Sequence, residues 1–589
     1  MVNSPHGFAK RRTLGATVKL NIALLTGLGL GLGGLACSST TPLQGGSAGN
    51  ATAAGGNSAT GASGSGSGNV PGSSGTGTTT GASGNAATGG ATSVGGGTAG
   101  AGNVSSGGAS SSTGGASSGG GSTGPAEPQL VTSGKDDFWK IGTLTKGGTT
   151  ATVTVTSSTA GRTWEGFGGT FNEAGWKVLM SLDAGKQTEI IRKLFDVSDG
   201  IGFTWGRIPI GPSDYAIERY NFQASKDAAF SIEHDKTASL APIIPYIKAA
   251  LAVKPDIKFW GSPWSPPPWM KTGASTAADS LGYDKGSMDK TFFDAYADYL
   301  VNWIKAYEAE GIKLNFIAPQ NEPGWAQAYP SCAWGSYYDG SDHHRGTAYL
   351  GDFVTGALST KMGAANLTTD IWYGTFSNHD TFSDYWANLP ADHSKVKGVA
   401  LQWATDADID TVLSAGFKVM QSEHKCGNYP WLDTKVTNVD DAKYDTFFAA
   451  YAPNNHAYGE ESWGLIKGWI DKGVISYSAW NMVLDKGGWN LDQARPWPQN
   501  ALVVVDNGTV KYTAAYYVFR HVAEYVDVGA TVLKVTGGNA LAFKNPDGAV
   551  VTIMYNSADQ ASATTLSIDG TLFQVSIPAH GWATVNWKA

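Results

Sequence analysis

Eight apolar, strand-like segments alternate with helix-like segments between residues 164 and 526, and this alternation constrains the fold more than any other feature of the sequence. Strands that alternate with amphipathic helices at this period predict a parallel sheet, and eight units predict a closed (β/α)8 barrel. In such barrels the active site lies at the carboxyl ends of the strands. The strands are expected near Phe167, in a segment ending at 207–211, and at 257–265, 314–320, 368–376, 396–403, 416–423 and 474–480. Helices are expected at 176–195, 240–252, 292–308, 462–470 and 514–525.

After residue 526 the pattern changes to short strands separated by turn signals, such as Asn545-Pro546-Asp547-Gly548. This pattern predicts a small antiparallel β-sandwich over residues 527–589. Residues 129–163, which include the alternating segment 152–156, are expected to add strands to that side domain. The side-domain strands are expected at 532–535, 540–544, 550–555, 564–568, 573–577 and 583–587.

The first 128 residues have no capacity to build a core. Residues 38–126 contain no charged and no aromatic side chain and consist almost entirely of Gly, Ser, Ala, Thr and Asn. Such a tract buries too little apolar surface to offset its ordering entropy, so residues 38–128 are predicted to be a disordered linker.

Residues 1–37 have the pattern of an export signal, with Lys10, Arg11 and Arg12 before an apolar, uncharged stretch at 20–36. Leu35-Ala36-Cys37-Ser38 resembles a bacterial lipoprotein cleavage box, although Gly34 stands where that motif usually has Leu. Two outcomes stay open: lipidation of Cys37 or simple cleavage. The expected location is therefore secreted, or the cell surface or outer membrane of a bacterium as a lipoprotein.

The charge and the aromatic content narrow the class of partner. The formal net charge is −8, and no Lys/Arg-rich run follows the export segment, which argues against a nucleic-acid partner. The chain contains 21 Trp, and Trp beside Pro and Gly in loops suits flat, partly apolar sugar rings.

Two glutamates are expected at strand tips of the barrel. Glu322 follows the fourth strand, because Pro319 and Pro323 end the ladder there, and Glu423 follows the seventh. Both carboxylates should therefore face the same end of the barrel, where such a pair suits glycoside hydrolysis. For an isolated Asn-Glu-Pro the alternative is a loop carboxylate that caps the next helix.

Several segments together resemble glycoside hydrolase family 30, the family of glucosylceramidases and microbial β-1,6-glucanases. The resemblance covers roughly residues 135–589. It implies a (β/α)8 barrel with an attached β-sandwich and a retaining mechanism without metal or cofactor. The matching motifs are Gly166-Phe167-Gly168-Gly169-Thr170-Phe171-Asn172-Glu173, Gly261-Ser262-Pro263-Trp264-Ser265-Pro266-Pro267, Gln320-Asn321-Glu322-Pro323, Gln421-Ser422-Glu423 and Ile577-Pro578-Ala579-His580-Gly581-Trp582-Ala583.

The resemblance also implies roles for single residues. Glu322 resembles the acid/base, whose pKa should be raised by its ionised partner and by burial, and Glu423 resembles the nucleophile. Arg207 resembles the arginine that supports the ionised nucleophile, and Asn321 the amide that binds the sugar 2-hydroxyl. Further substrate contacts are expected from Asp214, Trp264 and Trp480.

The sequence departs from the glucosylceramidase pattern at the sixth strand, where Gln402-Trp403-Ala404 replaces His-Trp-Tyr. This change makes glucosylceramide doubtful as the natural substrate, and an exported enzyme that acts on β-linked glycans is at least an equal interpretation. The expected activity is that of a monomeric retaining β-glycosidase, glucosylceramidase-like or β-1,6-glucanase-like. β-Xylosidase, β-fucosidase and β-1,6-galactanase activities stay open, as does a surface carbohydrate-binding protein that does not catalyse.

Beyond the export segment only Cys332 and Cys426 remain. Two cysteines in an exported chain suggest one disulfide, and two buried thiols are the alternative. Both follow the candidate catalytic glutamates closely, so a Cys332–Cys426 bond that braces the active-site loops is expected.

Overall fold

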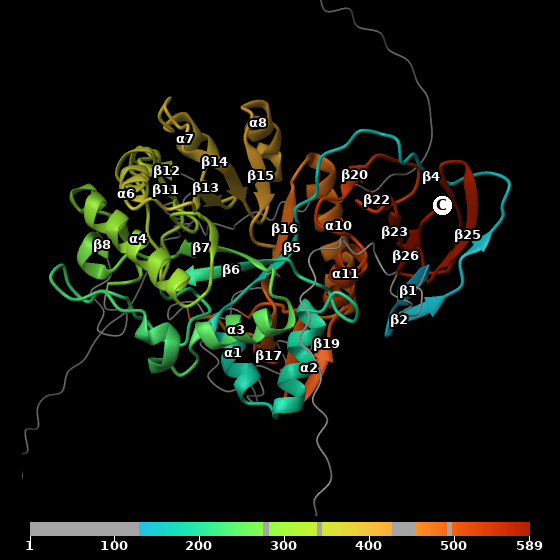
Figure 1. The fold of residues 1–589 in the computed structure, drawn as a ribbon, viewed down its shortest axis with the longest axis horizontal. Coiled ribbons are helices and arrows are strands. Elements are labelled where there is room, and N and C mark those ends of the chain that lie inside the picture. Colours follow the sequence, from blue (N-terminus) through green and yellow to red (C-terminus); the bar gives the residue numbers. More distant parts are fainter. Residues whose placement is uncertain (1–128, 275–281, 339–343, 427–453, 492–497) are drawn as a thin grey trace, which may run out of the picture. The chain divides into compact units, whose positions relative to one another are not determined.

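The computed structural model describes residues 129–274, 282–338, 344–426, 454–491 and 498–589 (Figure 1). The predicted export segment with Cys37 and the predicted linker lie outside these residues.

The eight predicted strands form one closed barrel in which every neighbouring pair is parallel. The order around the barrel is the order in the chain, which confirms the (β/α)8 prediction. The strands are β5 (Gly166–Thr170), β6 (Trp205–Ile210), β7 (Lys258–Pro263), β10 (Leu314–Ile317), β13 (Asp370–Phe376), β14 (Val396–Leu401), β15 (Lys418–Gln421) and β16 (Ser476–Asn481).

Large side chains from the strands pack against one another in a cluster of their own, as in the layers that fill a barrel interior. Phe316 lies between two indoles, stacking on Trp260 with ring centroids 5.1 Å apart and on Trp372 at 4.7 Å. The barrel is thus a packed core on which side chains at the strand tips can rest. The cluster comprises Trp205, Trp260, Phe316, Ala318, Trp372, Ala400 and Met420.

The five predicted helical segments are helical, two of them with different bounds, and four short helices between residues 350 and 414 were not predicted. The single helix predicted at 176–195 is two helices, because the Asp183 side chain accepts a hydrogen bond from the Lys186 N–H and starts a new helix there. The helix predicted at 462–470 begins earlier, where the Asn455 side chain caps it. The helices are α1 (Glu173–Met180), α2 (Ala184–Phe195), α3 (Ile243–Val253), α4 (Phe293–Ala309), α5 (Leu350–Phe353), α6 (Ser359–Ala364), α7 (Phe382–Ala387), α8 (Ile409–Ser414), α10 (His456–Lys472) and α11 (Ala514–Ala523). Among the described helices none is long and apolar enough to cross a membrane.

The side domain consists of a six-stranded and a five-stranded sheet, in the orders β2-β1-β26-β23-β22-β20 and β21-β4-β24-β25-β3. In Figure 1 the blue strands β1 and β2 lie beside the red strand β26, so the two ends of the described chain share one sheet. One pairing differs from the expected antiparallel pattern, because β4 runs parallel to β24. The strands are β1 (Leu130–Gly134), β2 (Asp137–Gly142), β3 (Thr145–Lys146), β4 (Val153–Val155), β20 (Thr531–Leu533), β21 (Val535–Thr536), β22 (Ala540–Lys544), β23 (Val550–Asn556), β24 (Ser562–Ile568), β25 (Thr571–Ile577) and β26 (Gly581–Trp587).

Three small sheets were not predicted. After the eighth barrel strand the chain forms β17 (Val483–Asp485), β18 (Val503–Asp506) and β19 (Thr509–Tyr512), and β17 packs against α1. The other two are hairpins in barrel loops, β8 (Lys271–Ala274) with β9 (Lys285–Met288) and β11 (Tyr337–Tyr338) with β12 (His344–Arg345).

Candidate active site

Glu322 and Glu423 follow the fourth and seventh barrel strands, as predicted, and line one cavity of about 360 Å³. Glu322 has a φ of 46°, in the left-handed region that non-glycine residues seldom adopt, and its N–H donates to the Thr375 carbonyl on β13. Trp403, at the tip of the sixth strand, has the same kind of backbone, with a φ of 55°. The cavity is lined by Asp214, Trp264, Asn321, Glu322, Trp325, Tyr329, Asn378, His379, Trp403, Ala404, Glu423, Lys425 and Gln499.

The Glu423 carboxylate lies between a positive charge and a hydrogen-bond donor. Its Oε2 is 2.5 Å from Nη1 of the fully buried Arg207, and its Oε1 accepts a hydrogen bond from Trp403 Nε1 at 2.8 Å. Both contacts stabilise a negative charge on Glu423. The guanidinium is held by aromatic rings, at 4.4 Å from Trp264, 5.0 Å from Trp260 and 5.3 Å from Trp480.

The same arginine orients Asn321. Arg207 Nη2 donates to Asn321 Oδ1 at 2.6 Å, and the Thr375 hydroxyl donates to the same oxygen at 2.9 Å. Because Oδ1 accepts both bonds, the amide donor of Asn321 is the group left to meet an acceptor in the cavity.

Glu322 has a different environment, with long contacts to two donors and a further hydrogen bond with Ser377. Gln402 Nε2 and the Tyr329 hydroxyl each lie 3.4 Å from its carboxylate oxygens. Burial raises the pKa of Glu322 well above its ordinary value, and the negative charge of Glu423 raises it further. A carboxyl group whose pKa is raised thus shares the cavity with a carboxyl group that is paired with a buried arginine.

A third carboxylate, Asp380, lies behind Glu322 and was not predicted. It is fully buried and accepts hydrogen bonds from the N–H groups of Gly324, at 2.6 Å, and Ser377, at 2.5 Å. Burial raises the pKa of Asp380 to about 7, and its charge contributes to the raised pKa of Glu322. No sequence pattern points to it, because Ser377-Asn378-His379-Asp380 has the composition of an ordinary turn.

Of the remaining predicted residues, some line the cavity and others are buried behind the residues that line it. Asp214, Trp264 and Asn321 line the cavity, as expected of substrate contacts. Arg207 and Trp480 are not among the residues that line the cavity. Arg207 is fully buried behind Glu423, and Trp480, 1% exposed, lies beneath Trp264 with ring centroids 5.1 Å apart.

Sequence reasoning missed the outer part of the cavity. The Trp325 ring stacks on His379 with centroids 4.0 Å apart, and both line the cavity with Trp403 and Tyr329. Trp403 and Gln402 could have been found, because both follow the predicted sixth strand, where side chains reach the active face.

The predicted disulfide is wrong, since Cys332 and Cys426 are both free and buried. Cys332 packs into the large core that surrounds the barrel, whereas Cys426 packs with Trp264 and Trp480 beneath the cavity. Neighbouring positions along strand tips therefore did not imply neighbouring side chains. The described part of the chain contains no group of three or more His, Cys, Asp or Glu side chains that could hold a metal ion.

Comparison with known proteins agrees with this geometry. The model of the glycosyl hydrolase family 30 TIM-barrel domain matches residues 164–491, and that of the family 30 β-sandwich domain matches residues 526–585. The endo-1,6-β-D-glucanase of Trichoderma harzianum is 25% identical over 421 residues, 67% of this chain and 77% of that protein. The lysosomal acid glucosylceramidase of Mus musculus is 22% identical over 460 residues, 72% of this chain and 81% of that protein.

Solved structures share the fold. SrfJ from Salmonella typhimurium matches with a TM-score of 0.63 at 21% identity, covering 78% of this chain and 99% of that one. An endo-β-1,6-glucanase matches with a TM-score of 0.61 at 22% identity, over 78% of this chain and 99% of that one. The chain, with a barrel and a sandwich that both match the family models, is a glycosyl hydrolase and belongs to glycosyl hydrolase family 30.

Proposed function

We propose that this protein is an exported, retaining β-glycosidase that hydrolyses β-linked glucosides or glucans, with Glu322 as acid/base and Glu423 as nucleophile. The observation that carries the proposal is the contrast between two carboxylates on one cavity. Glu423 is paired with Arg207, and Glu322 has a raised pKa.

This contrast supports a two-step reaction. In the first step a Glu423 oxygen bonds to the anomeric carbon, the glycosidic C–O bond breaks, and Glu322 gives its proton to the leaving oxygen. In the second step Glu322 takes a proton from water, whose oxygen displaces Glu423 from the sugar. Once Glu423 is esterified it carries no charge, so one cause of the raised pKa of Glu322 disappears. The pKa of Glu322 then falls, which favours the deprotonated form that acts as the base in the second step. A retaining enzyme requires the two carboxyl groups to lie about 5–5.5 Å apart.

Asn321 and Arg207 would assist the reaction in different ways. The Asn321 amide, fixed by Arg207, is available to donate to the sugar 2-hydroxyl, a contact that strengthens in the transition state. Arg207 keeps the nucleophile oriented and compensates its charge before and after the covalent step.

For the substrate we favour a β-1,6-linked glucan over glucosylceramide. The relatives include enzymes named for each. Ala404 lines the cavity where the glucosylceramidase pattern has Tyr, and the outer cavity carries the Trp325–His379 stack beside Asn378 and Lys425. Stacked rings next to polar side chains suit a second sugar unit better than a lipid chain.

The proposed location follows from residues 1–128, which lie outside the described part. Export, with lipidation of Cys37 and a flexible linker, would display the enzyme beyond a membrane surface. Mass analysis of the mature protein and of Cys37→Ser decides this. An unmodified N-terminus that begins after Cys37 would rule out the anchor.

The test of the catalytic proposal compares wild type with Glu423→Gln, Glu322→Gln and a matched control, Glu173→Gln. Glu173 is a second buried Glu that follows an Asn at a strand tip, but it does not line the cavity. On aryl β-glucosides Glu423→Gln should lose at least about a thousandfold in kcat, while the control stays active. Glu322→Gln should keep much more activity on a dinitrophenyl glucoside, whose leaving group needs no proton, than on a glucan.

Product stereochemistry, followed by NMR, should show retention of the β-anomer. Inversion, or turnover that survives Glu423→Gln, would refute the mechanism. Tight glycan binding by a wild type that hydrolyses no β-glycoside would favour a carbohydrate-binding protein without catalysis.

A further inference from the structure

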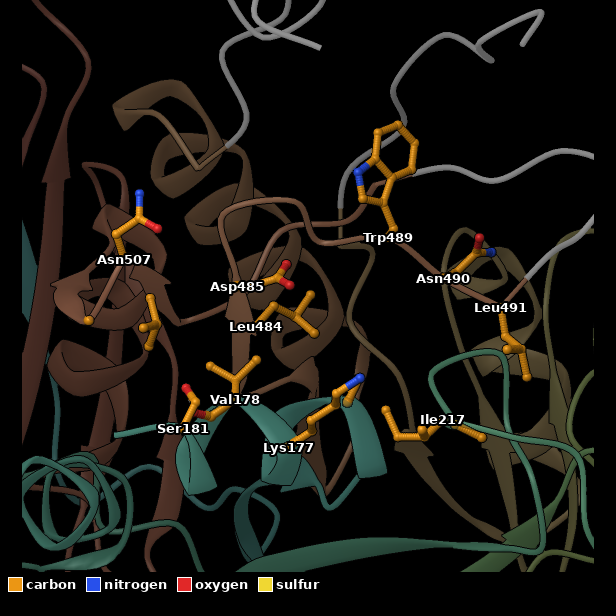
Figure 2. A pocket seen from close by; sticks show the side chains of 14 residues that line it. Lys177, Val178, Ser181, Ile217, Leu484, Asp485, Trp489, Asn490, Leu491 and Asn507 are labelled. Carbon is orange, nitrogen blue, oxygen red and sulfur yellow. The ribbon is translucent and has the colours of Figure 1, made fainter. Parts of the chain in front are cut away.

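A second cavity, separate from the active site, lies between α1 and the segment that follows the eighth barrel strand (Figure 2). Its volume is about 480 Å³, and it shares no lining residue with the active-site cavity. One face of α1 forms a wall with Ala174, Lys177 and Val178, and Ser181, which caps the carboxyl end of the helix, continues it. The opposite side comes from Ala216, Ile217, Leu484, Asp485, Trp489, Asn490, Leu491, Val505, Asn507 and Gly508.

The lining combines an apolar floor with a polar rim. Val178, Ile217 and Leu484 supply apolar surface, and Figure 2 shows the Trp489 indole above them. Lys177 and Asp485 are exposed side chains of opposite charge on this rim, so the cavity has no strong preference for an anion or a cation. An aromatic ring, apolar surface and both donors and acceptors are the groups that recognise a neutral sugar, with its apolar C–H faces and its hydroxyl groups.

Hydrogen bonds to backbone carbonyl groups connect the segments that line the two cavities. The Leu491 N–H donates to the Asp214 carbonyl at 2.6 Å, and the side chain of Asp214 lines the active site. The Tyr215 hydroxyl donates to the Gly488 carbonyl at 2.8 Å, and so does the N–H of Gln499, another active-site residue, at 2.9 Å. The segment 488–491 is thus bonded to residues of the active-site wall on one side and lines the second cavity on the other.

We propose that the second cavity binds a remote, neutral sugar unit of a polymeric glucan whose scissile bond lies in the active site. The proposal rests on the glucan substrate proposed above. The volume falls in the range of small-molecule sites and accommodates a disaccharide unit. An aryl glucoside carries a single sugar unit and the two cavities share no lining residue, so the site should affect polymers and leave short substrates unchanged.

The test fills the cavity from the exposed side of α1. Ser181→Trp places a large side chain in the cavity, and Met180→Trp is the matched control, because Met180 is exposed on the same helix and does not line it. With a linear β-1,6-glucan, Ser181→Trp should raise KM roughly five- to tenfold, which is the loss of affinity expected when one contact with an aromatic ring is removed. Both variants should hydrolyse an aryl β-glucoside as wild type does.

A second variant, Trp489→Ala, removes the indole and should raise KM for the glucan in the same way. Binding of the glucan to each variant in a Glu423→Gln background, measured by titration calorimetry, gives a readout without turnover. Equal glucan affinity in Ser181→Trp and Met180→Trp would overturn the proposal, as would a wild type that binds no glucan. Failure of the wild type to hydrolyse any aryl glucoside would instead overturn the proposed catalytic function, while the comparison of glucan binding would still decide the second site.

Discussion

Two Asn-Glu pairs follow strands of the barrel, one in a structural hydrogen-bond network and the other at a cavity. Asn172-Glu173 follows the first strand and Asn321-Glu322 follows the fourth. Burial is the main cause of a raised pKa in both glutamates, with that of Glu173 raised to about 7. Neither burial nor a raised pKa, therefore, tells the two glutamates apart.

The first pair closes a structural network. Asn172 Oδ1 accepts from the Gly175 N–H and caps α1, while the Glu173 carboxylate accepts from the Ile217 N–H and the Ser239 hydroxyl, both at 2.8 Å. His234 lies 3.7 Å from the same carboxylate. This pair caps a helix through its Asn side chain and keeps its Glu in a structural network.

The second pair lies open to a cavity. Glu322 has left-handed backbone, Gln402 and Tyr329 lie 3.4 Å from its carboxylate oxygens, and Glu423 lines the same cavity. The comparison teaches that an acid catalyst is marked by an open cavity and a second carboxylate, and not by burial alone.

The largest effect is expected from Arg207→Met, which removes the side chain that contacts both Glu423 and Asn321. Glu423 loses its counter-charge and Asn321 loses its strongest donor, so kcat should fall at least about a thousandfold and the free energy of unfolding by about 3–5 kcal/mol. Arg520→Met, which breaks the buried Arg520–Glu524 pair on α11, is the control for stability. Equal activity in the two variants would show that Arg207 is only structural.

A smaller loss is expected from Gln402→Leu. The buried Gln402 amide contacts Asn321 and Glu322 and accepts from the Ser422 hydroxyl, next to Glu423. Without it both glutamates lose a positioning contact, and kcat/KM on aryl glucosides should fall roughly 10–100-fold. Activity at the wild-type level, in a variant with unchanged thermal stability, would contradict this assignment.

Asp380→Asn should change the pH dependence more than the maximal rate. Removing a negative charge lowers the pKa of Glu322, so the alkaline limb of the kcat/KM profile should move to lower pH by about 0.5–1 unit. Asn carries one acceptor oxygen where Asp380 uses two, so a loss of stability of about 1 kcal/mol accompanies the shift. A profile that does not move would remove Asp380 from the catalytic network.

The smallest effect on activity is expected from Glu173→Gln, which tests the hydrogen bonds of Glu173 with Ile217 and Ser239. A carboxyl whose pKa is raised on folding adds stability that is complete below its unfolded pKa and is lost as pH rises through about 7. The wild-type Tm should therefore fall between pH 5 and pH 8, and the raised pKa of His234 acts in the same direction. In Glu173→Gln this fall should be smaller while kcat is unchanged. An equal fall in both proteins would show that Glu173 does not titrate in this range.

Local pattern was enough to predict the barrel strands and the main strands of the side domain, but not the small loop sheets or the short helices α5 to α8. Alternating strand and helix segments specified eight barrel strands, and turn residues specified the hairpins of the side domain, because burial periodicity and turn chemistry are properties of neighbouring residues. The same reasoning assigned Glu322 and Glu423 to strand tips. It failed at the break between α1 and α2, where the capping bond of Asp183 outweighed a continuous apolar pattern.

Contacts between distant segments were decided by the tertiary structure. Strand register and side-chain packing decide that Trp264 lines the cavity while Trp480 lies against Trp264, and they place Asp380 near Glu322. They also keep Cys332 and Cys426 in different clusters. The sequence by itself determined that two glutamates reach one end of a barrel, since parallel strands present their tips together. Only the packing of Arg207 between three indoles and two strand tips set one carboxylate apart from the other, because a charge is stabilised by what surrounds it in space.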